Sequence, residues 1–409
     1  MIIRPATRTE SVQEYYFSRK LKEIARMNLE RKASGGEPVI NLGIGSPDGM
    51  PPMPAIEALC EAAVRADSHA YQSYTGLPEL RQAFARWYSR WYGVDLDPET
   101  EIQPLAGSKE AVLLISLAFL DKGDKVLVPD PGYPTYSSAS KLAEAEIITY
   151  DLCAEKRWRP DFEALEAMDL TGVKMMWTNY PNMPTGAPAS EELYAELVDF
   201  GRRHSIMICN DNPYSFILND RPLSILSQPG AKDCCLELNS LSKAHNMAGW
   251  RIGMVAAHSD VIEQILKVKS QMDSGMFKPL QIAAVQALAQ GPEWFSTLNE
   301  EYRHRRALAG DIFDIMGVEY DHDSSGMFLW GRVPSSMTDA PHPDIPADSM
   351  RSVVPSAELS DRILYEAGVF ITPGFIFGKN GNDYVRISLC AKPEVLKQAA
   401  RRIGQVLKQ

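Results

Sequence analysis

The sequence predicts an α/β protein with a large domain, whose mostly parallel central sheet is covered by helices, and a smaller α+β domain. Strand-like apolar runs and amphipathic helix-like runs alternate from about residue 102 to residue 258, and such alternation is typical of parallel sheets with helices on both faces. Polar residues cluster where the predicted strands end, which is where sheets of this kind bind ligands. A chain of 409 residues is also long for one domain.

The elements follow from these patterns in chain order. An amphipathic helix over 11–33 stops at the pair Gly35-Gly36, and the apolar run 39–48 ends in a loop that contains Gly and Pro. The later patterns predict helices over 54–66, 78–92, 111–120, 135–145 and 190–204, and strands over 125–131, 146–151, 173–181, 206–214, 235–242 and 251–258.

A long helix predicted over about 260–290 leads into a C-terminal part whose short strand and helix patterns indicate the smaller domain. We therefore divide the chain into an N-terminal arm with part of the small domain (1–50), a large domain (51–290) and a small C-terminal domain (291–409). Residues 334–357 are rich in Pro, Ser and Asp and predict a long surface loop.

Composition and charge exclude several classes of function. The net charge of -11 argues against a nucleic-acid-binding surface, which needs clustered positive charge. The six cysteines have no CxxC or His-linked spacing, so we interpret them as reduced packing residues of a cytoplasmic protein without a metal site. The N-terminus has no signal-peptide pattern, and no run of 18 or more apolar residues occurs, so neither export nor membrane insertion is indicated.

The stretch SLSKAHNMAGWRIG, residues 240–253, contains the main catalytic candidate, Lys243. A lysine held beside apolar or cationic groups loses its proton more readily and can form a Schiff base with an aldehyde. Ser240 offers a hydroxyl and Arg251 a planar charged fork, and together they suit a phosphate. For this motif alone, a surface lysine in a Ser-rich turn is the alternative.

The stretch resembles the lysine segment of the class I and II pyridoxal-phosphate-dependent aminotransferases, which are fold type I enzymes of the aspartate aminotransferase superfamily. In that family a lysine carries the cofactor and a downstream arginine binds its phosphate. The resemblance implies pyridoxal 5'-phosphate as the cofactor of this chain, with Ser240, Lys243 and Arg251 among its ligands.

A second phosphate-binding candidate is the segment LAGSKEAVLLI, residues 105–115, in which a Gly-Ser pair opens a helix. Free backbone N–H groups and the positive end of the helix dipole favour an anion there. An ordinary helix cap is the alternative for the motif alone. By resemblance, Gly107, Ser108 and Lys109 occupy the loop that cradles the cofactor phosphate.

Three aromatic or acidic residues lie where predicted strands end. Tyr133 is framed by prolines in PDPGYPTY, and by resemblance its ring stacks on the cofactor. Asp211, in NDNPY, is costly to bury without a cationic partner; the resemblance supplies one, the protonated ring nitrogen. Tyr214 matches the family's hydrogen bond to the ring oxygen. Alone, DNPY fits an Asx turn as well.

The segment NYPNMPTGA, residues 179–187, resembles the family's Asn-Pro-Thr-Gly turn but has Met183 in place of the asparagine that bonds the ring oxygen. A thioether cannot donate that bond. Either Asn182 reaches in from the neighbouring position or Tyr214 holds the oxygen alone, and we favour Asn182 slightly.

The substrate site rests on Arg386, in the strand pattern DYVRISLC. A buried arginine needs an anionic partner, and a substrate carboxylate satisfies it with two hydrogen bonds; an internal salt bridge is the alternative. The resemblance assigns Arg386 to the α-carboxylate, with a backbone group near Gly45. It also matches Tyr71 to a tyrosine that reaches the neighbouring subunit's cofactor phosphate, which implies a homodimer with shared active sites.

We therefore expect transamination between an L-amino acid and a 2-oxo acid, with glutamate and 2-oxoglutarate as one pair, and Lys243 as the general base and acid. A β-lyase on the same scaffold is the nearest rival. An aminotransferase-like domain of a transcription regulator is disfavoured by the charge and by the absence of room for a helix-turn-helix module. Arg19, Lys20 and Lys109 are candidate readers of the substrate side chain, and Lys109 resembles a substrate-binding lysine of the diaminopimelate aminotransferases.

Overall fold

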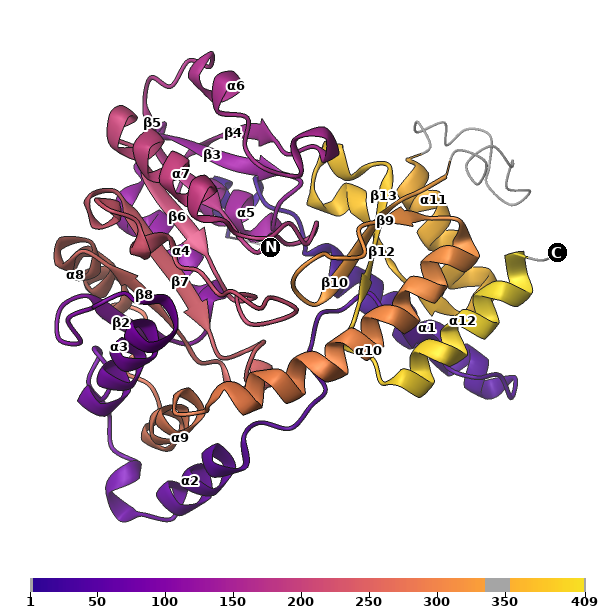
Figure 1. Cartoon of the computed structure of the whole chain (residues 1–409), viewed down its shortest axis with the longest axis horizontal. Coiled ribbons are helices and arrows are strands. Elements are labelled where there is room, and N and C mark those ends of the chain that lie inside the picture. Colours follow the sequence, from indigo (N-terminus) through magenta and orange to yellow (C-terminus); the bar gives the residue numbers. More distant parts are fainter. Residues whose placement is uncertain (1–2, 335–353, 408–409) are drawn as a thin grey trace.

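The computed structural model describes residues 3–334 and 354–407, and its centre is a seven-stranded sheet (Figure 1). The strand order is β2-β8-β7-β6-β5-β3-β4. The strands are β2 (Ile102–Leu105), β3 (Lys125–Asp130), β4 (Glu146–Asp151), β5 (Val173–Thr178), β6 (Met207–Asp211), β7 (Cys235–Ser240) and β8 (Gly253–Ala257). The run from β7 to β4 is parallel, whereas β8 is antiparallel to both neighbours. The mostly parallel sheet predicted from the alternation is confirmed.

Helices cover both faces of this sheet, because successive strand residues point to opposite faces. Met175 and Trp177 of β5 pack in one core with Val112, whereas Met176 packs in another with Leu197. The helices of this part are α2 (Met53–Ala63), α3 (Pro78–Tyr92), α4 (Ser108–Phe119), α5 (Pro134–Leu142), α6 (Phe162–Glu166), α7 (Glu191–His204), α8 (Ser259–Lys269) and α9 (Lys278–Leu288). Both faces being buried explains why the strands read as continuous apolar runs.

A second body of structure is built from residues of both the N-terminal and the C-terminal part of the chain. Its strands are β1 (Ile40–Asn41), β9 (Glu319–Tyr320), β10 (Phe328–Arg332), β11 (Val369–Phe370), β12 (Thr372–Pro373) and β13 (Tyr384–Ser388), and its helices are α1 (Tyr16–Ala33), α10 (Pro292–Met316), α11 (Pro355–Arg362) with a π-helical turn (Ile363–Ala367), and α12 (Pro393–Leu407). Strand β1 pairs in parallel with β11, and Ile40 and Leu42 share a core with Phe313 and Ile387. The domain boundaries at residues 50 and 290 stay a prediction.

The predicted helix over 260–290 is wrong in its continuity. Helix α8 ends at Lys269 and α9 begins at Lys278, with Gly275 between them at a φ of 90°. Pro279 stands in the first turn of α9, where its missing N–H costs nothing, but it would break a helix interior. The long helix of the chain is α10, which begins beside the large core at Phe295 and continues into the second one.

Three smaller differences concern element limits. Helix α1 begins at Tyr16 rather than at residue 11, and β2 was not predicted. Most of the surface loop predicted over 334–357 lies outside the described residues, and its last three positions belong to the start of α11. No helix in the described part of the chain is both long and apolar enough to cross a membrane.

Candidate active site

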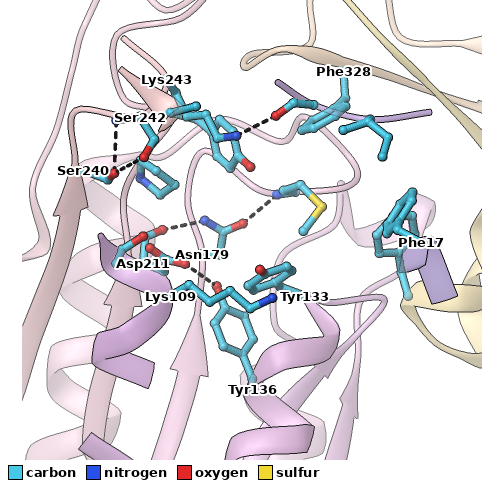
Figure 2. Close-up of a pocket in the computed structure, with 18 of the residues that line it drawn as sticks. Phe17, Lys109, Tyr133, Tyr136, Asn179, Asp211, Ser240, Ser242, Lys243 and Phe328 are labelled. Atoms are coloured by element: carbon cyan, nitrogen blue, oxygen red, sulfur yellow. Dashed lines mark hydrogen bonds between the residues drawn. The ribbon is translucent and has the colours of Figure 1, made fainter. Parts of the chain in front are cut away.

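A pocket of about 440 Å³ lies beyond the carboxyl ends of the central strands, and we call it the inner pocket. Residues that follow β2, β3, β5, β6 and β7 all reach it, together with residues of the second body of structure. Ten of the residues singled out from the sequence line it, namely Gly45, Ser108, Lys109, Tyr133, Asp211, Tyr214, Ser240, Lys243, Arg251 and Arg386. Figure 2 shows Lys243 entering from one side and Tyr133 with Lys109 from the other.

One end of the inner pocket is built for an anion. Helix α4 begins at Ser108, and Gly107 before it has a φ of 86°, a conformation that glycine adopts without strain. A side chain at Gly107 would overlap the Arg251 guanidinium. The Ser240 hydroxyl donates to the Ser242 hydroxyl over 2.7 Å, and Arg251 Nη1 lies 3.5 Å from the latter. Helix N-terminus, hydroxyls and guanidinium therefore converge at one place, which suits a phosphate.

Asp211 ends β6 in the floor of the inner pocket. Tyr136 donates its hydroxyl to Asp211 Oδ2 over 3.0 Å, and the Asn179 amide donates to the Asp211 backbone carbonyl. The other carboxylate oxygen, Oδ1, is buried and has no hydrogen-bond partner. Burial raises the pKa of Asp211 to about 7. An unpaired buried carboxylate oxygen is costly, so this site favours a cationic donor in the pocket.

Lys243 follows β7 and projects into the inner pocket, where its Nζ donates to the Gly45 carbonyl over 2.6 Å. Burial lowers the pKa of the Lys243 ammonium, and the positive charges of Arg386 and Arg251 lower it further, against an opposing effect of Cys390 and Asp211. A lowered pKa increases the fraction of free amine, which is the form that acts as a nucleophile or a base.

Arg386 of β13 is buried and lines the inner pocket. Its Nη2 donates to the Gly43 carbonyl over 2.8 Å and its Nη1 lies 3.1 Å from the Met183 sulfur, while Nε has no partner. The guanidinium carbon lies 3.9 Å from the Phe328 ring centroid and 4.7 Å from that of Phe377. Burial lowers the pKa of Arg386 to about 10. No acid pairs with it in the described residues, so the internal salt bridge is not formed.

The sequence from residue 37 to residue 403 matches the family model described as aminotransferase class I and II. The chain belongs to this family of aminotransferases. The aminotransferase is 36% identical over 404 residues to the LL-diaminopimelate aminotransferase of Dehalococcoides mccartyi, with 98% of each chain covered. It is 39% identical over 376 residues to that of Aquifex aeolicus, covering 91% of this chain and 93% of the relative. The substrate-bound structure of BacF from Bacillus subtilis superposes with a TM-score of 0.88 at 32% identity, covering 99% of this chain and 98% of that one.

Membership of the family makes pyridoxal 5'-phosphate the cofactor, and the inner pocket fits it. The orphaned Oδ1 of Asp211 suits a protonated ring nitrogen. The convergence of Gly107, Ser240 and Arg251 suits the phosphate, and the Lys243 amine lies in the same pocket to receive an aldehyde. The match therefore rests on three separate chemical features of the aminotransferase, supplied by residues at the ends of β2, β6 and β7 and by Arg251.

The region around Met183 differs from the prediction that we favoured. The Asn182 amide donates to the Asn179 carbonyl, and its oxygen accepts from the Thr185 hydroxyl over 2.7 Å. Asn182 is buried in this turn and does not line the inner pocket, because both its amide nitrogen and its amide oxygen are bonded within the turn. Met183 lines the pocket instead, as does Tyr214, which stays the predicted donor for the ring oxygen. Burial raises the pKa of Tyr214, which keeps its hydroxyl protonated.

Four of the other candidate residues do not line the inner pocket of their own chain, namely Arg19, Lys20, Tyr71 and Gly107. Tyr71 is 91% exposed, so it contributes nothing to the site that its own chain forms. Lys20 is buried between Glu23 and Asp361, and these ion pairs account for its charge. Lys109 does line the pocket, with its ammonium 4.6 Å from the Tyr15 ring centroid.

Sequence reasoning missed several residues of the site. Tyr136 and Asn179, which donate hydrogen bonds to Asp211, lie inside the PDPGYPTY and NYPNMPTGA segments. A buried aspartate needs hydrogen-bond donors, and this requirement could have indicated both residues. Tyr15 and Phe17 line the inner pocket from the N-terminal side of the chain. No local pattern places residues 15–17 beside Arg386, because their contact depends on the pairing of β1 with β11 and on α1.

Proposed function

We propose that this aminotransferase moves the amino group between an L-amino acid that carries a second carboxylate and 2-oxoglutarate, with glutamate as the product of the second half-reaction. The observation that carries this proposal is the pair of cations left over in the inner pocket once Lys243 and Arg251 are assigned to the cofactor. Arg386 and Lys109 both line the pocket, and a diacid satisfies both. The names of the relatives, which are LL-diaminopimelate aminotransferases, point to an amino diacid of that type.

Each side chain has one task in this reaction. The cofactor supplies, when bound, an aldehyde and a ring that withdraws electrons from the reacting carbon. Lys243 would hold the cofactor and, once released as a free amine, would take the proton from the substrate α-carbon and deliver it to the carbon that had been the cofactor's aldehyde carbon, which its lowered pKa permits. Asp211 keeps the ring nitrogen protonated, and Tyr136 orients Asp211.

Arg386 holds the α-carboxylate in this proposal, and with it the orientation of the α C–H bond. Arg386 Nε has no hydrogen-bond partner in the described residues, and Nη1 contacts the sulfur of Met183, so these two nitrogens remain available to a carboxylate. Because Phe328 and Phe377 exclude water from the guanidinium, the ion pair with a carboxylate is stronger than in water. The Gly45 loop, which accepts from Lys243, closes the same side of the pocket.

We also propose that the active unit is a homodimer in which Tyr71 completes the neighbouring site. Support comes from a group of exposed apolar side chains on two adjacent segments, with Tyr71 at 91%, Met272 at 50% and Phe277 at 45% exposure. The His69 and Phe277 rings lie 6.2 Å apart, so these segments form one patch. An exposed apolar patch of this kind is typical of a protein interface.

The experiment that tests the substrate proposal is a panel of amino donors with the second carboxylate at different positions or absent. We expect diaminopimelate and glutamate to convert the cofactor in a single half-reaction, and Lys109→Ala to raise KM for both about tenfold while leaving alanine unaffected. Lys122→Ala, which removes an exposed charge outside the pocket, is the matched control. Equal loss for alanine and the diacids would show that Lys109 does not read a second carboxylate. A β-lyase would release its product without consuming 2-oxoglutarate.

A further inference from the structure

A second pocket of about 430 Å³ adjoins the inner pocket, and the function proposed above does not use it. We call it the outer pocket. It is formed by the N-terminal segment before and at the start of α1, by α5 and by the loop after β12. Four aromatic residues line both pockets and form the wall between them, namely Tyr15, Phe17, Tyr133 and Phe377.

The wall is in contact with both cations that we assign to the substrate. The guanidinium of Arg386 lies 4.7 Å from the Phe377 ring centroid and 5.8 Å from that of Phe17, and the Lys109 ammonium lies over Tyr15. Figure 2 shows Phe17 at the side of the inner pocket away from Ser240 and Ser242. A substrate anchored at Arg386 therefore begins next to this wall.

The outer pocket carries positive charge that the described residues do not neutralise. Arg19 and Lys141 line it, both are exposed, and neither forms an ion pair with an acid in the described part of the chain. Its one acidic lining residue is Glu14, which is paired with Lys22 over 2.6 Å. Two cations beside an aromatic wall suit a ligand with an apolar chain and an anionic end.

We propose that the outer pocket binds the distal carboxylate of substrates too long for Lys109 to serve, with Arg19 and Lys141 as the specificity-determining residues. The substrate class is that of amino diacids whose second carboxylate is many bonds from the α-carbon, including those lengthened by an acyl group. The methylene chain crosses the aromatic wall between the two pockets. This inference rests on the proposed function, because it places the α-carboxylate at Arg386.

The test measures binding of unbranched dicarboxylates, from butanedioate to decanedioate, to the cofactor-loaded enzyme by titration calorimetry. These compounds carry no amino group and cannot react, so the readout is a dissociation constant. We expect affinity to rise with chain length, and the double variant Arg19→Ala/Lys141→Ala to weaken the longest diacids about tenfold while butanedioate changes by less than about twofold. Arg26→Ala/Lys122→Ala removes the same charge from exposed positions outside both pockets and should leave the whole series unchanged.

A second variant tests the pocket itself. Ser137 lines the outer pocket, and Ser137→Trp fills it without removing a charge, so the gain in affinity with length should disappear. The inference is overturned if long diacids bind the Arg19/Lys141 variant as tightly as the parent, if the control variant loses the same affinity, or if Ser137→Trp leaves the length dependence intact. Failure of the proposed function has another signature, because butanedioate would then not bind and glutamate would not transaminate.

Discussion

Replacement of Arg386 by lysine separates the geometry of the substrate site from its charge. The variant keeps a cation in the pocket but loses the planar fork, so one of two parallel hydrogen bonds to the α-carboxylate disappears; a charge-assisted bond contributes about 1.5–3 kcal/mol. The contact with Phe328, at 3.9 Å from the guanidinium carbon, contributes about 0.5–1 kcal/mol more. We therefore expect Arg386→Lys to lose about 2–4 kcal/mol in kcat/KM, or roughly 30- to 900-fold.

The assay compares kcat/KM for glutamate in the parent and the variant, with the cofactor absorbance as a check on folding and loading. That absorbance should survive, since the hydrogen-bond contacts of Arg386 in the described residues are with Gly43 and Met183 and not with the residues that converge on the phosphate-binding end of α4. Arg303→Lys, on the exposed surface of α10, controls for an arginine-to-lysine change as such. A variant that binds the cofactor and transaminates at the parent rate would refute the assignment of the carboxylate to Arg386.

Three further predictions follow from the site. In the folded, cofactor-free protein Asp211 keeps its proton up to about pH 7, whereas in the unfolded chain it loses the proton near pH 4. The free energy of unfolding should therefore fall by up to about 4 kcal/mol as pH rises from about 4 to about 7. Asp211→Asn should remove that part of the fall. Asn182→Ala should leave the pH titration of the cofactor absorbance unchanged, because its amide is bonded within the turn, whereas Tyr214→Phe should shift it; the reverse result would restore Asn182 as the donor. If Tyr71 serves the neighbouring site, mixing the inactive variants Tyr71→Ala and Lys243→Ala should recover activity in mixed dimers; no recovery would place Tyr71 in its own subunit's site or in none.

The large sheet was predictable because its signals are local. Each parallel strand is buried on both faces and therefore appears as an apolar run, and each functional residue at a strand end follows such a run directly, as Asp211 and Lys243 do. The break between α8 and α9 was also local, since Gly275 and Pro279 stand in the sequence. It was missed because the amphipathic pattern on either side outweighed these two residues.

The residues that the sequence did not reveal depend on contacts between distant parts of the chain. Phe17 reaches Arg386 only because α1 packs beside the sheet that contains β13. The orientation of Asn182 could not be predicted for another reason, because residues 183–185 form a turn and not a strand, so the alternation of side chains along a strand does not apply there. The motif identifies a turn at 179–187, but it does not show which side chain of that turn faces the pocket. The hydrogen bonds within the turn decide this.

The central claim is that Lys243 carries the cofactor, and reduction with borohydride tests it most directly. Reduction fixes the cofactor to the amine that holds it, and mass spectrometry of the digested protein then identifies the modified lysine. We expect a single modified peptide that contains Lys243, and no adduct with Lys243→Ala, because Lys243 lies in the inner pocket and its lowered pKa favours the free amine that reacts with the aldehyde. An adduct on a different lysine, or one that persists in Lys243→Ala, would contradict the account.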